Sequence, residues 1–258
     1  LRNLSVLDQF IKHLYETIPH LDILINNAAQ AIRRPPIFYQ NLLATESKQL
    51  EEFKNPAIYQ ILPQDFGALP MDSSNEFRLQ IKNDVMDTEI VVDKQIAQNV
   101  SGSVLESLVP LTYHDFNPDV KSFPQGVVDK DGQQVDLSKR NSWSKQIEEV
   151  DFVEFAETQI INSWAPWQLC AKLKDLMRKS EHKYKYIINV TSVEGQMNRQ
   201  KRGAHPHTNM SKASLNMITR SCGVHYAQSN ILINSVDTGW VTEMQPKLLL
   251  SEVRTVPL

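Results

Sequence analysis

Apolar residues at helical spacing open the sequence, and a short apolar run follows them. The first pattern places apolar side chains three or four positions apart, at Leu7, Phe10, Ile11, Leu14 and Ile18. This spacing predicts an amphipathic helix over residues 1–18. LDILINNAA (residues 21–29) comes next and ends in polar residues. It is typical of a buried parallel strand whose carboxyl end reaches the surface.

A second patterned region, residues 151–246, alternates helical periodicity with β-rich runs. Its elements in order are a long helix interrupted near Pro166 (151–178), the strand KYIINVTS (185–192), a helix (208–227), the strand NILINSV (230–236) and the loop DTGWVTEMQP (237–246). Strands that alternate with helices need right-handed crossover connections and pair in parallel. The sequence therefore predicts an α/β fold, namely a three-layer Rossmann-like parallel sheet with helices on both faces.

The residues between these two regions show a mixed pattern. Their local signals are a break at RRPP (33–36), a helix over FYQNLLATESKQLEEF (38–53), a capping box at Ser73 and Glu76, and a hairpin over FPQGVVDKDGQQVDL (123–137) that turns at Asp131–Gly132. We interpret residues 1–258 as one partial domain of the predicted fold. Residues 30–150 are then a large insertion of mixed structure within it.

Charge and hydropathy narrow the classes of partner. Basic side chains number 27 against 30 acidic ones, for a net charge of −3. No excess of positive charge therefore favours nucleic acid or an anionic membrane surface. No apolar run approaches the roughly 18–20 residues of a membrane-spanning helix. We expect neither a nucleic-acid partner nor a membrane span.

The cysteines and histidines do not form a recognisable disulfide or metal motif. Cys170 and Cys222 are far apart and make no CxxC pair. This is typical of free thiols in a cytoplasmic or other reducing intracellular compartment. The 7 histidines show neither HxxxH nor HExxH spacing, so no metal site is predicted.

Polar residues follow each predicted strand at its carboxyl end. These residues are Asn26–Ala29, Ser192 and Asp237–Gly239. In open parallel sheets the chemistry lies in the crevice beyond the carboxyl ends of the strands. We therefore expect the three groups to converge in space.

Five short motifs occur in order on these elements. They are NNAA (26–29), the asparagine of INSWAP (161–166), NVTS (189–192), TxxxKA (208–213) and NSVDTGWVT (234–242). Together they resemble the short-chain dehydrogenase/reductase family, whose marks are an NNAG strand end, a helix asparagine, an active serine, YxxxK and a PG loop. The resemblance covers residues 1–29 and 151–246. The long insertion and the sequences HPHTNMSKA and DTGWVT resemble a branch of this family in which threonine replaces the tyrosine.

The resemblance implies roles for several side chains. Hydride delivery to a carbonyl carbon builds negative charge on its oxygen, which must be hydrogen-bonded and protonated. By position, Ser192 would hydrogen-bond that oxygen, Lys212 would hold the nicotinamide ribose and Asn162 would support a water relay. The residues implied to contact an NAD or NADP cofactor are Asn26, Asn27, Ala28, Lys212, Thr238, Gly239 and Thr242.

Thr208 stands where the family carries the tyrosine that donates the proton. It precedes Lys212 by four residues, so both side chains lie on one face of the predicted helix. An aliphatic hydroxyl is far less acidic than a phenol, and losing a positioned acid costs about 10²–10⁴ in rate. His205 or His207 could substitute, because histidine titrates near neutral pH. We therefore expect weakened or altered proton donation.

The resemblance also implies that part of the family fold lies outside this sequence. The chain has 8 glycines and none in residues 1–66, whereas a dinucleotide-binding loop needs several that are closely spaced. We expect the chain to be an internal segment of a longer protein. It would bind NAD or NADP only if the full-length chain supplies the glycine-rich loop.

Two interpretations of function stay open. The first is an NAD(P)-dependent oxidoreductase-like protein that acts on a small-molecule carbonyl or alcohol. The alternative is a non-catalytic scaffold of the same fold, an assembly subunit in a homo-oligomer or larger complex, which Thr208 and the insertion favour. A hydrolase that uses Ser192 is disfavoured, because VTSVEG lacks a glycine-flanked nucleophile elbow. RNSW (140–143), at the end of the insertion, is a candidate to fold over the active site.

Overall fold

The computed structural model describes residues 1–39, 77–83, 86–92, 110–124, 126–128, 134–239 and 244–246. The chain divides into two compact units. Unit 1 comprises Leu1–Arg33 and Arg140–Gln245, and unit 2 comprises Arg34–Lys139 and Pro246–Leu258. Most of unit 2 comes from the region that the sequence predicts to be an insertion.

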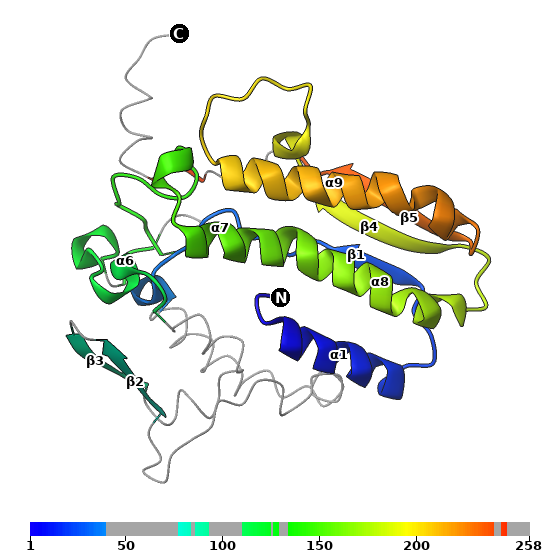
Figure 1. The fold of residues 1–258 in the computed structure, drawn as a ribbon, viewed down its shortest axis with the longest axis horizontal. Helices are drawn as coiled ribbons and strands as arrows, with labels where there is room; N and C mark the ends of the chain where they lie inside the picture. The colour runs from blue at the N-terminus through cyan, green and yellow to red at the C-terminus, as the bar shows by residue number, and fades with distance from the viewer. Residues whose placement is uncertain are drawn as a thin grey trace. The chain divides into compact units, whose positions relative to one another are not determined.

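Unit 1 contains a three-stranded parallel sheet in the order β1–β4–β5 (Figure 1). Its strands are β1 (Ile23–Asn26), β4 (Lys185–Thr191) and β5 (Ile231–Asp237). All three run in the same direction, so their carboxyl ends meet at one edge of the sheet. This confirms the parallel Rossmann-like sheet predicted from the alternating pattern.

Helices alternate with these strands along the chain. α1 (Leu4–Thr17) precedes β1, α7 (Phe152–Gln159) and α8 (Ala165–Arg178) precede β4, and α9 (Pro206–Ala227) connects β4 to β5. The side chain of Asn3 caps α1 by accepting from the backbone N–H groups of Ser5 and Val6. Asp151 caps α7 in the same way through the N–H of Val153. Both are residue types that satisfy the unpaired N–H groups at a helix start.

A π-helical stretch, Ile160–Trp164, joins α7 to α8. The interruption predicted near Pro166 therefore lies a few residues earlier. Pro166 itself lies just after this stretch, at the start of α8, and supplies no N–H to the continuous helical run. Asn162 lies within the π-helical stretch, a type of irregularity that is frequent at functional sites.

The hydrophobic core of unit 1 lies between the sheet and the helices that cover one of its faces. Its buried members include Leu7, Ile11, Leu169, Leu173, Leu176, Met177, Ile187 and Ile231. The covered face is the one to which Leu24, Ile187 and Ile233 belong. On the opposite face the side chains of Ile23 and Ile25 are 53% and 57% exposed. The described residues thus contain one of the two helical layers of the predicted α/β fold.

A polar layer crosses the sheet at a single register, under α8 and α9. Asn26 Nδ2 donates to Asn189 Oδ1 at 2.8 Å and lies 3.6 Å from Cys170 Sγ. Asn189 Nδ2 donates to Thr219 Oγ1 at 2.9 Å, and Ser235 Oγ donates to the same oxygen at 2.8 Å. Both asparagines are buried, so these bonds satisfy groups whose burial would otherwise cost free energy.

Unit 2 contains an antiparallel strand pair and short helical turns. The strands are β2 (Phe77–Asn83) and β3 (Met86–Val92), and the turns are α6 (Tyr113–Phe116) and η1 (Val120–Ser122). Neither strand is among the predicted elements, although Phe77, Leu79 and Ile81 alternate with polar residues in the period of a strand. The short length of this alternation explains why it gives a weak signal.

The hairpin predicted over residues 123–137 has an antiparallel bridge between Val128 and Gln134. Val135 N–H also donates to Val127 O at 3.0 Å. The predicted turn at Asp131–Gly132 lies outside the described residues. The same holds for the capping box at Ser73 and Glu76 and for most of the helix predicted over residues 38–53.

Candidate functional site

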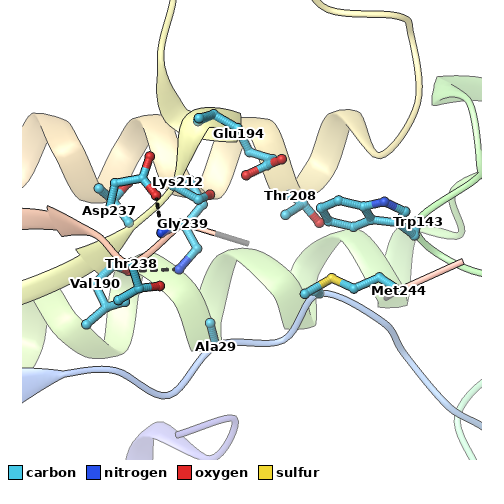
Figure 2. A pocket seen from close by; sticks show the side chains of 14 residues that line it. Ala29, Trp143, Val190, Glu194, Thr208, Lys212, Asp237, Thr238, Gly239 and Met244 are labelled. Carbon is cyan, nitrogen blue, oxygen red and sulfur yellow. Dashed lines mark hydrogen bonds between the residues drawn. The ribbon is translucent and has the colours of Figure 1, made fainter. Parts of the chain in front are cut away.

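A pocket of about 530 Å³ opens at the carboxyl ends of the three strands of unit 1 (Figure 2). It is lined by Ala29, Ala31, Trp143, Val190, Thr191, Ser192, Val193, Glu194, Thr208, Lys212, Asp237, Thr238, Gly239 and Met244. The lining therefore includes residues that follow each of the three strands. The convergence of strand ends expected from the sequence occurs at this pocket.

The turn that carries Ser192 rests directly on α9. Ser192 follows β4 in an extended conformation and begins η4 (Val193–Gly195). A Cβ at Gly195 would lie 2.7 Å from both the backbone C and O of Lys212, so only glycine permits this approach. Asn216 Nδ2 donates to Gly195 O at 3.1 Å and holds the turn in place. Through this contact Ser192 and Lys212 are fixed beside one another.

Lys212 lines the pocket from α9 and is 8% exposed. Its Nζ donates to Val190 O at 2.9 Å. Burial lowers the pKa of Lys212 from its ordinary value, and the nearby carboxylate of Glu194 opposes this shift. A buried cation with one backbone partner has donor capacity left for a ligand.

Thr208 lies on the same helix, four residues before Lys212, and also lines the pocket. It is 3% exposed, and its Oγ1 is buried with no hydrogen-bond partner among the described residues. Buried hydroxyls without partners are uncommon in folded proteins. The position that the resemblance assigns to the proton donor therefore holds an unpaired hydroxyl.

Asn162 does not line the pocket but supports its walls. Its Oδ1 accepts from Gln30 N–H at 2.7 Å, and its Nδ2 donates to Gln30 O at 2.9 Å and to Ser211 Oγ at 3.0 Å. Asn162 is 1% exposed. It therefore ties the loop after β1 to α9, next to Lys212. This makes it a positioning residue in the described structure.

The implied cofactor residues fall into two groups. Asn26 belongs to the polar layer under the helices, and neither it nor Asn27 or Ala28 lines the pocket. Thr238 and Gly239 do line it. Gly239 has a φ of 75°, which favours glycine, and its N–H donates to Asp237 Oδ1 at 3.0 Å. Thr242 lies outside the described residues.

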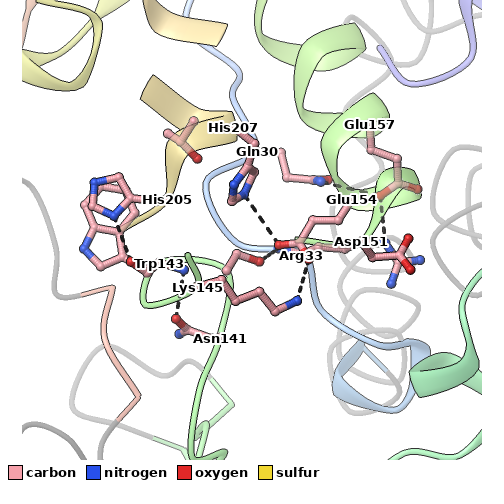
Figure 3. Close-up of polar contacts among 12 residues, drawn as sticks. Gln30, Arg33, Asn141, Trp143, Lys145, Asp151, Glu154, Glu157, His205 and His207 are labelled. Carbon is pink, nitrogen blue, oxygen red and sulfur yellow. Dashed lines mark hydrogen bonds and ion pairs between the residues drawn. The ribbon is translucent and has the colours of Figure 1, made fainter. Parts of the chain in front are cut away.

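Two histidines at the start of α9 do not line the pocket. Figure 3 shows their polar contacts. His207 is 1% exposed, and its Nε2 is 3.5 Å from Glu154 Oε1. Glu154 also pairs with Lys145 at 2.6 Å. Burial lowers the pKa of His207, against the opposing effect of Glu154. His207 therefore faces Glu154, and His205 stacks on Trp143. Neither histidine lines the pocket, and their role as substitute proton donors stays a prediction.

Trp143, Glu194 and Met244 line the pocket, yet none belongs to the implied catalytic or cofactor set. Trp143 ends the RNSW segment that the sequence suggested as a cover for the site. Glu194 follows Ser192 by two residues, so its proximity to the strand end was available from the sequence. Met244 carried no comparable signal.

The described residues contain no group of three or more histidine, cysteine or acidic residues that could hold a metal ion. Cys170 and Cys222 are free thiols, and burial raises the pKa of Cys170 to about 12. No described helix is both long enough and apolar enough to cross a membrane.

The parallel sheet and its strand-end pocket define a Rossmann-like α/β protein. Residues 137–251 match the family model described as enoyl-(acyl carrier protein) reductase. This match supports the resemblance to the short-chain dehydrogenase/reductase family that the motifs carry. The narrower resemblance to a branch with threonine at position 208 stays a prediction.

Solved structures with similarity to the chain include two carbonyl reductases and one short-chain dehydrogenase/reductase. They are carbonyl reductase Sniffer of D. melanogaster (26% identity, TM-score 0.36, 38% of this chain and 44% of that one), NADPH-bound carbonyl reductase from chicken fatty liver (22%, 0.34, 39% and 46%) and a Brucella ovis short-chain dehydrogenase/reductase with a partially ordered NAD (22%, 0.34, 39% and 43%). The chain thus spans less than half the length of each. No curated protein matches the sequence significantly.

Proposed function

We propose that this chain is the catalytic part of an NAD(P)-dependent oxidoreductase that interconverts a carbonyl and an alcohol in a small-molecule substrate. One observation carries the proposal. Ser192 from the end of β4, Lys212 from α9 and Gly239 from the end of β5 line the same pocket. Hydride transfer to a carbonyl needs a hydrogen-bond donor for the oxygen and groups that hold the cofactor at one point in space, and these three residues can supply them.

The strand-end side of the pocket fits the nicotinamide half of a dinucleotide. Gly239 carries no Cβ at its φ of 75°, so the backbone there leaves space for a flat ring. Lys212 offers an ammonium group to the ribose hydroxyls, and Thr238 offers a hydroxyl. When bound, the cofactor would supply or accept the hydride. The phosphates would need donors beyond those of this pocket.

The side chains of the pocket would handle the charge and the proton. Ser192, whose hydroxyl makes no hydrogen bond to another described residue, would donate to the carbonyl oxygen and stabilise its negative charge. Thr208 would deliver the proton more slowly than a phenol, because its hydroxyl is less acidic. The expected deficit is about 10²–10⁴ in rate. Lys212 would favour the deprotonated form of a neighbouring hydroxyl through its positive charge.

Cofactor titration tests the proposal. The full-length protein is titrated separately with NADPH and NADH, and binding to at least one of them is expected. Lys212→Met should weaken that binding about 10- to 150-fold, the range for losing a hydrogen bond from a charged group. Lys172→Met is the matched control, because Lys172 lies exposed on α8 and does not line the pocket. Absence of binding to both cofactors would reject the proposal.

The unpaired hydroxyl of Thr208 also favours a second candidate, a non-catalytic scaffold that keeps the fold without its acid. The two candidates differ in the effect that a tyrosine at position 208 would have on turnover. In an intact active site it raises turnover, whereas in a scaffold it changes nothing.

A further inference from the structure

We propose that Trp143, backed by His205, selects the substrate, and that the substrate class is uncharged carbonyl compounds with a flat conjugated group beside the carbonyl. This inference rests on the proposed function, since it assigns the substrate of the same pocket. It comes from a stacked pair of rings at one end of that pocket.

The indole and imidazole rings form a tight parallel stack (Figure 3). Their centroids are 3.9 Å apart and their planes differ by 9°. His205 Nδ1 lies 2.8 Å from Trp143 O, and His205 N–H donates to Lys145 O at 2.8 Å. His205 also begins α9 in the left-handed region, with a φ of 43°. The imidazole therefore covers one face of the indole, and the pocket that Trp143 lines meets the rest of the ring.

Contacts of the neighbouring residues Asn141 and Lys145 also fix the segment that carries Trp143. Trp143 N–H donates to Asn141 Oδ1 at 3.0 Å, and Asn141 Nδ2 donates to Met244 O at 2.8 Å. Lys145 pairs with the buried carboxylate of Glu154. These bonds fix the indole before a ligand arrives. A pre-positioned ring loses little conformational entropy on binding, so more of the contact energy appears as affinity.

The position of the indole separates two ends of the pocket. In Figure 2, Trp143 and Met244 lie toward one end with Thr208, whereas Val190, Asp237 and Thr238 lie toward the other. The second end is where the nicotinamide fits in the proposed function. The Trp143 end is then the part left for the substrate. A flat unsaturated group there would stack on the indole and meet the Met244 thioether, which also contacts aromatic rings favourably.

The charges of the pocket favour uncharged ligands. Glu194 and Asp237 both line it, and the ammonium of Lys212 already donates to Val190 O. A carboxylate on a substrate at the Trp143 end would therefore approach the carboxylate of Glu194, whereas Lys212 would contact the cofactor at the other end. The pocket combines an aromatic platform with an acidic rim, which excludes anionic substrates and keeps neutral ones.

Calorimetric binding of matched ketones tests the inference without any cofactor or turnover. The probes are 2-acetylnaphthalene, its fully saturated counterpart 2-acetyldecalin and the anionic 6-acetyl-2-naphthoate. The wild-type protein should bind 2-acetylnaphthalene about 2- to 13-fold more tightly than 2-acetyldecalin, the range expected for an aromatic pair beyond burial alone. It should bind 6-acetyl-2-naphthoate most weakly.

Three variants assign this preference to the ring stack. Trp143→Leu should abolish the preference for the aromatic ketone, and Trp143→Phe should keep part of it. His205→Asn, which tolerates the left-handed conformation, should reduce the preference. Trp167→Leu is the control, because Trp167 is 58% exposed on α8 and does not line the pocket. Equal affinities for the two neutral ketones in the wild type, or an undiminished preference in Trp143→Leu, would overturn the inference. Loss of NADPH and NADH binding alone would instead overturn the proposed function.

Discussion

Replacing Gly195 by alanine should separate Ser192 from Lys212 without touching either side chain. The new Cβ would lie 2.7 Å from the backbone C and O of Lys212, whereas carbon atoms reach their optimal contact near 3.5 Å. The turn and the helix must therefore move apart by about 0.8 Å. Backbone atoms of α9 cannot move aside as the end of a flexible side chain can. The displacement therefore shifts the turn that carries Ser192 relative to Lys212.

The size of the effect follows from this displacement. Overpacking of a well-packed contact costs roughly 1–3 kcal/mol of stability. Lys212 Nζ now donates to Val190 O at 2.9 Å, and a shift of about 0.8 Å takes a bond of that length past the range of good geometry. We therefore expect the dissociation constant of the preferred nicotinamide cofactor to rise at least about 10-fold, because a hydrogen bond from a charged group is worth that much.

Two measurements on Gly195→Ala check the reasoning. Urea unfolding gives the free energy of unfolding, and cofactor fluorescence gives the dissociation constant. Gly223→Ala is a matched control, since a Cβ at Gly223 on α9 meets no atom within 4 Å. That control should be more stable by about 0.5–1 kcal/mol and should bind the cofactor normally. Wild-type stability and affinity in Gly195→Ala would refute the close contact between the Ser192 turn and α9.

Three further predictions concern the surroundings of the pocket. Asn162→Leu should cost about 1–3 kcal/mol in urea unfolding, because it leaves the half-buried N–H and C=O of Gln30 without their partner; an unchanged midpoint would contradict this. Burial lowers the folded-state pKa of His207 below its ordinary 6.5, so the native state binds fewer protons there, and stability should fall as the pH drops below 6.5 toward the lowered value. His207→Phe should flatten that part of the stability profile, and an identical profile would oppose the assignment. Asp151→Ala should lose about 1 kcal/mol through its N-cap, measured by the same unfolding assay.

Much of unit 1 could be predicted because its signals are local. β4, β5 and α9 come from runs whose periodicity is set by neighbouring residues, and parallel pairing follows from their alternation. That topology brings Ser192 and Gly239 to one edge without any knowledge of side-chain contacts. The family match over residues 137–251 agrees with this reading.

The rest of the site depends on contacts between distant segments. Trp143 reaches the pocket because His205, 62 positions away, stacks on it and bonds to its carbonyl. The burial of His207 against Glu154 is likewise a tertiary effect, which the sequence could not predict. A single proline also drew the predicted helix break toward Pro166, whereas the π-helical stretch that carries Asn162 has no such sequence marker. The hydrogen bond of Asn26 to Asn189 across the sheet also depends on strand pairing between distant segments.

Restoring the phenol at position 208 tests the central claim that Ser192, Lys212 and residue 208 form one reductase site. Thr208 borders a pocket of about 530 Å³, so a tyrosine side chain has space to extend into it. Thr208→Tyr should raise NADPH- or NADH-dependent reduction of 2-acetylnaphthalene by about 10²–10⁴-fold. Met210→Tyr, on the exposed side of the same helix, should leave the rate unchanged. A correctly folded Thr208→Tyr variant that binds cofactor yet shows no gain in turnover would contradict the claim and favour a scaffold.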